Sequence, residues 1–314
     1  MDKKARETYF RLVNTRYQRC LEPQEQCNSA PIRAHSIQNS RILDQMSDDG
    51  HVMMPRLSHD PNGTPVVEFK TIGRNQATTF TGLCSTHDAE IFRPIDTNRL
   101  DVADPEHLFL LAYRAVLKES HACLETACKF QSVYQARVEA GTSPRDRPDA
   151  AGLQAVEWLC NAYDMYLYKR KYDDAYLNKN HSRIAHRHIQ LDHVPVSIAV
   201  SALFSLDDIE WPDDVARVAM NVFPFEGKVH VVFSFLAKEA RFAEQYLQKV
   251  FSARGHYQRY LISKTVLQHC ANFVVAPSYY ETMSEEKKRA LIDFFRHTLS
   301  RNQHDYENEN LYLF

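Results

Sequence analysis

Four side chains in the first 90 residues are of the types that hold a soft metal ion. Six residues separate Cys20 from Cys27, and two separate Cys84 from His87. Structural zinc sites take four ligands tetrahedrally, and sets rich in thiolates are typical of them. The second pair lies in a stretch that we expect to form a turn opening a helix, so that the turn presents the cysteine and the first helical turn the histidine. We therefore predict a structural zinc site formed by Cys20, Cys27, Cys84 and His87.

The alternative is that these thiols are inert core side chains, which is common for cysteine in a reduced protein. The six-residue spacing of the first pair is looser than the usual two to four. In favour of the metal, residues 20 to 100 are polar and interrupted by Gly, Pro and Asn. A small module of that composition usually needs a metal to hold it folded.

The bulk composition narrows the class of protein. The 314 residues carry a formal net charge of −2, which argues against binding nucleic acid through overall basicity. No apolar run reaches the 18 residues of a membrane span, and the first 20 residues do not resemble a signal peptide. We expect a cytoplasmic protein without a membrane partner, in which the seven cysteines favour metal binding over disulfides. The sequence contains no dinucleotide or P-loop glycine motif and no G-x-S-x-G nucleophile motif.

The order of patterns along the chain predicts an α+β fold. Residues 1–100 read as a small N-terminal zinc-bound module, and residues 101–314 as a larger α+β domain. That domain begins with a helical hairpin, continues with a β-rich segment that forms a small antiparallel sheet, and ends with closing helices. The tail from residue 301 to 314 is predicted to be loosely held.

Several elements have specific local signals. Helical spacing of apolar residues predicts long helices from Pro105 and over 150–178, and Gly227 supplies the positive φ of a tight β-hairpin. Further elements are expected as a charged helix over 2–18, a strand over 64–73, and helices over 238–253 and 284–300, with Asp104 and Ser284 as N-caps.

Two sequence stretches resemble the zinc-bound treble-clef form of the HNH nuclease fold. They are "IRAHSIQ" (residues 32–38) and "LCSTHD" (residues 83–88), and the resemblance covers residues 20–95. In HNH nucleases a first zinc knuckle precedes a strand that carries the general-base histidine, and a second knuckle begins a helix. The same stretches are similar to a group of bacterial proteins.

The resemblance implies a role for each matching residue. Cys20, Cys27, Cys84 and His87 would hold the structural zinc. His35 would be the general base, Asp88 would bind a catalytic Mg²⁺ or Mn²⁺, and Asn75 or His51 would fill the remaining polar roles. The sequence departs from the family pattern at Ala34, where an acidic residue usually stands, and at Gln38, where a proline does. In place of a second histidine on the helix, Glu90 follows His87.

The resemblance leads to two hypotheses about function. The first is a metal-dependent, HNH-like protein that cleaves nucleic acid, DNA rather than RNA, in bacterial defence against phage, with a possible protein partner in a defence complex. The alternative is a module that has kept its zinc without catalysis and recognises nucleic acid or a partner protein within a larger assembly. In the first case His35 is catalytic, and in the second it hydrogen-bonds inside the module.

One further stretch, residues 164–193, combines tyrosines with lysines, arginines and four histidines. This mixture suits binding of a single-stranded nucleic acid backbone, but a solvated helix end whose tyrosines enter the core would have the same composition. The histidines could also form a metal site. The remaining cysteines, Cys123, Cys128, Cys160 and Cys270, are predicted to be core residues.

Overall fold

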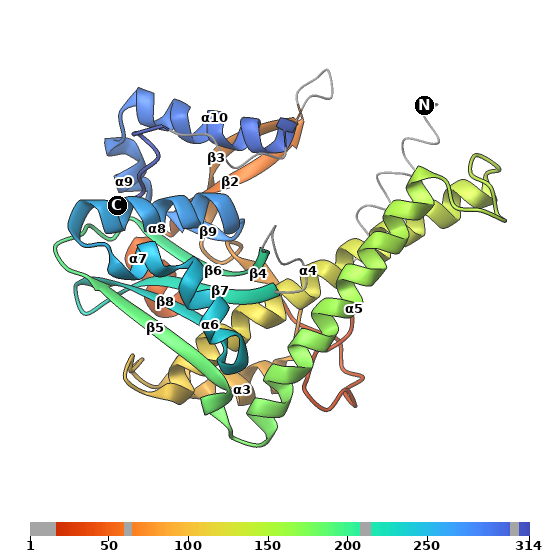
Figure 1. The fold of residues 1–314 in the computed structure, drawn as a ribbon, viewed down its shortest axis with the longest axis horizontal. Helices are drawn as coiled ribbons and strands as arrows, with labels where there is room; N and C mark the ends of the chain where they lie inside the picture. The colour runs from red at the N-terminus through yellow and green to blue at the C-terminus, as the bar shows by residue number, and fades with distance from the viewer. Residues whose placement is uncertain (1–16, 60–64, 208–214, 302–307) are drawn as a thin grey trace. The chain divides into compact units, whose positions relative to one another are not determined.

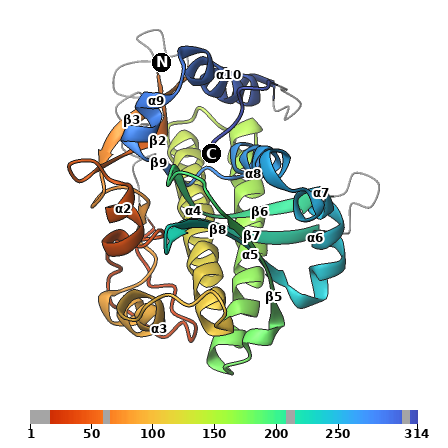
Figure 2. The ribbon, with the colours of Figure 1, turned by 90° about the vertical axis from the view of Figure 1, so that its left-hand side faces the viewer.

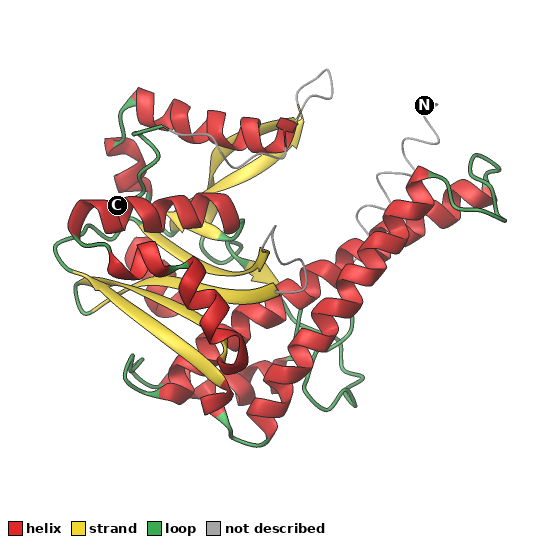
Figure 3. Ribbon diagram, in the orientation of Figure 1, coloured by secondary structure: helices red, strands yellow, loops and turns green. Residues whose placement is uncertain are grey.

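The computed structural model describes residues 17–59, 65–207, 215–301 and 308–314. The predicted helix over 2–18 falls almost wholly on residues outside this set. The described chain consists of helices and antiparallel strands (Figure 3), which confirms the α+β prediction. None of its helices has both the length and the apolarity that crossing a membrane requires.

The chain divides into two compact units that interleave along the sequence. In its described part, the first unit holds residues 17–34, 80–93 and 116–181, and the second holds residues 35–79, 94–115 and 182–314. Two helices, α3 (Ser85–Thr97) and α4 (Pro105–Glu139), pass from one unit into the other. The division at residue 100 stays a prediction about which parts fold independently.

The described part of the second unit contains a seven-stranded sheet in the order β3-β2-β9-β6-β7-β8-β5 (Figure 1). Every recorded pairing in it is antiparallel. The predicted strand over 64–73 is β3, which pairs with β2, so two strands from the first hundred residues belong to the main sheet. The strands are β2 (His51–His59), β3 (Pro65–Gly73), β5 (Ile184–Leu191), β6 (Ile198–Asp207), β7 (Val215–Phe225), β8 (Lys228–Leu236) and β9 (Phe273–Val275).

The predicted hairpin joins β7 to β8. Phe225 faces Lys228 across the turn, and the two residues between them have positive φ, 52° at Glu226 and 74° at Gly227. Positive φ at both central residues is the geometry of the tight turn that matches the twist of the flanking strands. Most of the other described residues of both strands are buried, and those that face the main core are apolar. Turn chemistry and burial therefore specify the same register.

One face of this sheet forms the main apolar core with the C-terminal helices. The core includes Val222, Val231 and Phe233 from the central strands and Ile262 and Phe294 from the helices. The predicted helix over 238–253 is interrupted at Leu247, and the one over 284–300 begins after Ser284, whose Oγ accepts a hydrogen bond from the Lys287 N–H. The helices of this region are α6 (Ala240–Tyr246), α7 (Gln248–Ser252), α8 (Gly255–His269), α9 (Pro277–Thr282) and α10 (Glu285–Arg301).

The C-terminal tetrapeptide belongs to the same core, so the prediction of a loosely held tail is wrong for it. Leu311, Leu313 and Phe314 are buried. The Leu313 N–H donates to Ser263 Oγ, and the Ser197 hydroxyl donates to the Leu313 carbonyl, both at 2.9 Å. Three apolar side chains in four residues outweigh the polar residues that precede them.

The first unit contains an antiparallel helical hairpin, made of α4 from residue 116 and α5 (Ala150–Leu177), which run side by side in Figure 2. The rings of Phe130 and Trp158 stack at 5.9 Å between centroids. A Cβ at Gly152 would lie 2.7 Å from Pro148 Cβ and 2.8 Å from the Tyr134 ring, so a larger residue there would force these neighbours to shift. Both long helices were predicted, and Asp104 accepts a hydrogen bond from the Glu106 N–H as the expected N-cap.

The tyrosines of residues 164–193 differ in burial. Tyr168 and Tyr172 are fully buried on α5, whereas Tyr166 and Tyr176 are half-buried. The interpretation in which these tyrosines enter the core therefore holds for the first two. Among the remaining cysteines Cys270 is buried, Cys123 and Cys128 are half-buried, and Cys160 is exposed, which makes the core prediction wrong for Cys160.

Several short elements lie near the N-terminus. They are β1 (Ala34–His35) and β4 (Thr79–Phe80), which pair in a separate two-stranded sheet, a π-helical turn over Asn39–Leu43, and α2 (Asp44–Met46).

Candidate metal centre

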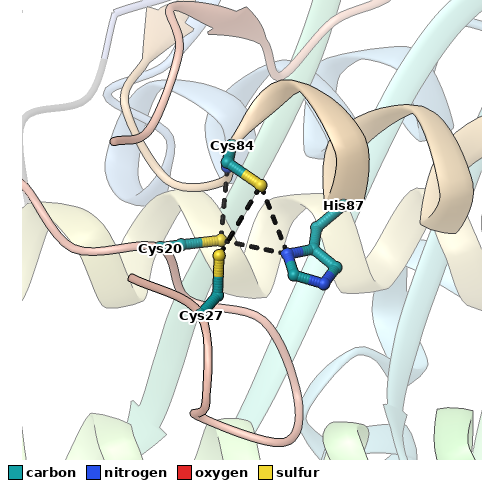
Figure 4. Close-up of side chains that lie close together, drawn as sticks. All are labelled: Cys20, Cys27, Cys84 and His87. Atoms are coloured by element: carbon teal, nitrogen blue, oxygen red, sulfur yellow. Dashed lines mark hydrogen bonds between the residues drawn. The ribbon is translucent and has the colours of Figure 1, made fainter. Parts of the chain in front are cut away.

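The four predicted ligands meet in the first unit. Cys20 and Cys27 come from the irregular segment before β1, while Cys84 directly precedes α3 and His87 lies in its first turn. One ligand atom from each side chain lies within 4.8 Å of all the others (Figure 4). The four residues lie together as predicted, and the cluster can hold a metal ion.

The distances within the cluster match the edges of a small tetrahedron. The Sγ atoms of Cys27 and Cys84 are 3.8 Å apart. The Nδ1 atom of His87 lies 3.5 Å from Cys20 Sγ and 3.3 Å from Cys84 Sγ. Zinc bonds of about 2.3 Å to sulfur and about 2.0–2.1 Å to nitrogen give tetrahedral edges of about 3.8 Å between sulfurs and about 3.6 Å between sulfur and nitrogen. The side chains therefore already surround a space of the size that zinc needs.

Backbone hydrogen bonds hold the two halves of the cluster together. The Leu21 N–H donates to the Gly82 carbonyl, and the Ile32 N–H donates to the Leu83 carbonyl, both at 2.8 Å. The Cys84 N–H in turn donates to Cys20 Sγ at 3.2 Å. A donor to sulfur stabilises the thiolate, which is the form that binds metal.

The turn before α3 depends on a glycine. A Cβ at Gly82 would lie 2.4 Å from the ring of Phe80, closer than any real contact of this kind. Only glycine lets the chain pass this ring on its way to Cys84.

Glu22 organises the loop between the two N-terminal cysteines. Its carboxylate is buried and accepts hydrogen bonds from the N–H groups of Gln24 at 2.7 Å, Cys27 at 3.0 Å and Gln26. Burial alone would raise the pKa of this carboxyl, but the three backbone donors outweigh it and lower the pKa. The negatively charged Glu22 carboxylate therefore fixes the position of the Cys27 backbone. A lone glutamate two residues after a cysteine carries no sequence signal for this role.

In the absence of a metal ion, the thiols of Cys20 and Cys27 have different pKa values. Burial raises the pKa of Cys20 to about 12. At Cys27 the Ser29 N–H, which donates to the sulfur, lowers the pKa to about 7. The chemistry of this donor set is that of a closed structural site, because three sulfurs and one nitrogen fill all four positions of a tetrahedral ion.

The residues assigned to catalysis by resemblance do not belong to one unit. His35 and Asn75 are in the second unit, and Asp88 is in the first. His35 is half-buried on β1, and its Nε2 lies 3.0 Å from the Arg74 carbonyl oxygen. Burial lowers its pKa. The amide of Asn75 is exposed, and its Oδ1 accepts a hydrogen bond from Asn39 at 2.9 Å.

The other two candidates for catalytic roles, Asp88 and His51, lie on α3 and β2. Asp88 is half-buried in the first turn of α3, a position where a carboxylate stabilises the helix dipole. His51 is exposed at the start of β2, and its Nδ1 lies 2.8 Å from the Asp49 carbonyl oxygen. The predicted roles of these side chains in catalysis stay predictions.

The histidines of residues 164–193 make other contacts. Nε2 of His188 lies 2.8 Å from Nδ1 of His230 on the neighbouring strand, and Nδ1 of His186 lies 2.8 Å from Ser234 Oγ. Among the described residues, three or more potential ligand side chains gather tightly enough for one ion only at the Cys₃His cluster. Comparison of the chain with protein-family models, curated proteins and solved structures gives no match.

Proposed function

We propose that Cys20, Cys27, Cys84 and His87 bind one zinc ion and that this ion is structural. The observation that carries the proposal is the tetrahedral spacing of the four ligand atoms. The soft ligand set favours zinc over Mg²⁺ or Ca²⁺, which prefer oxygen. Bound zinc would link the segment around Cys20 and Cys27 to the start of α3.

We further propose that the protein acts on nucleic acid as an HNH-like phosphodiesterase, with DNA as the first substrate to test. Besides the sequence resemblance, the state of His35 supports this. A carbonyl oxygen only accepts hydrogen bonds, so the contact with Arg74 places the ring proton of a neutral imidazole on Nε2. Nδ1 is then the nitrogen that can accept a proton from an attacking water. The lowered pKa keeps the ring neutral near pH 7.

The catalytic divalent ion has less support than the zinc. Mg²⁺ or Mn²⁺ would stabilise charge at the scissile phosphate, and the resemblance assigns it to Asp88. The described residues contain no second group of three ligand side chains beside the Cys₃His cluster. The residues present therefore do not fit a catalytic ion held by the protein alone, and we derive no step through it.

The second candidate function is a non-catalytic, zinc-stabilised module that binds nucleic acid or a partner protein. The specific observation in its favour is that His35 and Asp88 belong to different units, while the Asn75 carboxamide is engaged by Asn39. In this case the Arg74 carbonyl simply satisfies a half-buried histidine. A cytoplasmic role in defence against phage, with a protein partner, is proposed from the resemblance alone.

A cleavage assay on matched variants separates the two functions. The wild-type protein, His35→Ala and His256→Ala, which changes an exposed histidine of α8, are compared on plasmid DNA and on single-stranded RNA with Mg²⁺ or Mn²⁺, after the zinc content of each has been measured. The nuclease proposal predicts cleavage by wild type, a loss of about 100-fold or more in His35→Ala, since general-base catalysis contributes 10²–10⁴-fold, and little change in His256→Ala. Full zinc content with no cleavage by any of the three proteins would instead favour the binding module.

A further inference from the structure

Helix α8 carries tyrosines and cations along one side. Arg254 directly precedes the helix, and Tyr257, Tyr260 and Lys264 follow within it at intervals of three, three and four residues. Residues three and four apart are neighbours on the surface of a helix. Tyr257 is 58% exposed, Arg254 is exposed, and Tyr260 and Lys264 are half-buried. These four residues, which we call the tyrosine track, therefore lie on the solvent side of α8.

The tyrosine track is distinct from the side of α8 that packs on the C-terminal tetrapeptide (Figure 1). On that side the ring of His256 stacks on the ring of Tyr312 at 4.7 Å between centroids, and Arg259 Cζ lies 5.9 Å from the centroid of the Tyr312 ring. The hydrogen bond from the Leu313 N–H to Ser263 Oγ is on the same side. His256 and Arg259 therefore belong to the packing of the tetrapeptide and not to the track.

Within the track, two rings lie between two positive charges. The rings of Tyr257 and Tyr260 are nearly parallel, with 19° between their planes and 6.4 Å between their centroids. Lys264 Nζ lies 5.7 Å from the centroid of the Tyr260 ring. At the other end, Arg254 Nη1 donates to the Phe251 carbonyl at 2.8 Å, which holds the guanidinium at the start of the helix. The order along the helix is therefore cation, ring, ring, cation.

The sequence around α8 is free of carboxylate side chains. Residues 245–280 contain neither Asp nor Glu, although acidic residues outnumber Lys and Arg by 40 to 38 in the whole chain. The same stretch carries four cations, which are Lys249, Arg254, Arg259 and Lys264. A local excess of one charge attracts ligands of the opposite charge even where the net charge is small. The charge of this stretch is therefore complementary to a polyanion.

We propose that the tyrosine track binds single-stranded nucleic acid, with bases stacked on its two rings and phosphates at its two cations. An aromatic ring accepts any base through its π-face, and cations beside the rings follow the phosphate backbone. In a duplex the base faces are stacked on one another and cannot reach the rings, while an acidic peptide would use the cations alone. The class of ligand rests on the proposed function, but neither His35 nor the zinc ligands belong to this surface.

The test is the dissociation constant of the full chain for fluorescein-labelled oligo(dT) and oligo(U), measured by fluorescence anisotropy without Mg²⁺ or Mn²⁺. Tyr257→Ala should raise the dissociation constant for both oligonucleotides about tenfold, because one stacked base loses its ring. Tyr257→Phe keeps the ring and should bind as wild type does. The matched control is Tyr163→Ala, which removes a ring of similar exposure, 62%, from α5 and should leave binding unchanged.

The salt dependence of binding tests the two cations. Arg254→Gln with Lys264→Gln should reduce the slope of log affinity against log salt by about one for each phosphate contact removed, whereas Tyr257→Ala should weaken binding without changing the slope. The control, Arg145→Gln with Arg147→Gln, makes the same change of charge in the exposed loop between α4 and α5 and should keep the wild-type slope. Should the first double variant lose helicity, Lys264→Gln alone takes its place.

Four results would overturn the proposal. They are no binding of either oligonucleotide at low salt, an equal loss in Tyr257→Ala and Tyr163→Ala, tighter binding of duplex than of single strands, and displacement of the oligonucleotide by polyglutamate at equal charge. Binding is measured without the divalent ion that cleavage would need. A chain that binds through the track without cleaving would therefore support the track and reject the nuclease, and cleavage by a chain whose binding ignores the track would do the reverse.

Discussion

The zinc-ligand segment, residues 17–34, and the central strands β6 to β8 are held together by different forces. Along β8 every residue after Lys228 is buried, and the strand is hydrogen-bonded on both sides. In the zinc-ligand segment the buried apolar side chains are those of Cys20, Leu21 and Ala34. The sheet is therefore stabilised by apolar burial, whereas the segment has little of it, and we propose that it depends on the metal ligands and on Glu22 instead.

The difference indicates which region of the chain would depend on a bound metal for its folding free energy. A chain region with little apolar surface cannot offset its conformational entropy by burial. Four soft ligands can replace that burial, because metal binding supplies folding free energy directly. The two regions should therefore respond to different perturbations, and the following experiments are ordered from the largest expected effect to the smallest.

Removal of the metal should produce the largest difference in stability between the zinc-ligand segment and the sheet. Structural zinc contributes about 10–16 kcal/mol in small zinc modules at pH 7. Chelation, or Cys84→Ser, should therefore abolish the amide-exchange protection of Leu21 and Ile32 while β7 and β8 keep theirs. Hydrogen exchange read by mass spectrometry measures both regions at once. Cys123→Ser, which changes a half-buried thiol outside the cluster, is the control, and a sheet that loses protection together with the segment would contradict the comparison.

A cavity in the sheet should have the reverse effect. Phe233 is fully buried between the strands and the helices, and its ring contacts that of Phe251. Phe233→Ala is expected to lower the free energy of unfolding by about 3–5 kcal/mol. Denaturant titration measures the loss, and zinc content should not change. A variant that loses its zinc while still folded would show that the two regions are coupled.

A smaller effect is expected from Glu22→Gln. The amide can accept fewer and weaker hydrogen bonds than the carboxylate, and each bond to a charged group is worth about 1.5–3 kcal/mol. Zinc affinity, measured by competition with a chromophoric chelator, should fall by about tenfold or more, while the unfolding of the sheet stays as in wild type. The exposed Glu90→Gln is the matched control. Equal zinc affinity of Glu22→Gln and Glu90→Gln would show that the Glu22 carboxylate does not position the zinc ligands.

The mildest perturbation of the sheet is acid. Burial, and for His230 also the neighbouring His188, lowers the pKa of both imidazoles in the folded chain. A histidine whose folded pKa lies below its unfolded value of about 6.5 destabilises the fold once the unfolded state binds the proton. Stability should therefore be constant above about pH 7 and fall as the pH drops through 6.5 and below.

Thermal unfolding between pH 8 and 5 measures this slope. In His188→Gln the slope should be shallower, because one of the two imidazoles no longer titrates. The comparison variant is His51→Gln, since His51 is exposed and lies outside the core of the sheet. An equal slope in His188→Gln and wild type would assign the acid sensitivity to other groups.

Local signals in the sequence were sufficient for several elements. The caps at Asp104 and Ser284 and the Gly227 hairpin all depend on neighbouring residues only, and all are confirmed. The clustering of Cys20, Cys27, Cys84 and His87 was also predictable, because a Cys₃His set restricts the chemistry strongly even when its halves are far apart in the chain.

Features that depend on distant packing were not predictable. Strand β5 lies in a segment rich in Arg and His, and its place beside β8 is visible only in the sheet. Leu311, Leu313 and Phe314 follow a polar stretch, yet they are buried in the main core, where the Leu313 N–H donates to Ser263 Oγ. Cys160 has a helical context that suits a core position, but it lies on the side of α5 opposite to the buried face. In each case a partner far along the chain decides the outcome.

The central claim is that Cys20, Cys27, Cys84 and His87 hold one zinc ion. It is tested most directly by elemental analysis of the purified protein together with X-ray absorption at the zinc edge. The account predicts one zinc per chain with about three sulfurs at about 2.3 Å and one nitrogen at about 2.0–2.1 Å. Absence of zinc after expression in zinc-supplemented medium, or a shell of oxygen and nitrogen without sulfur, would contradict it.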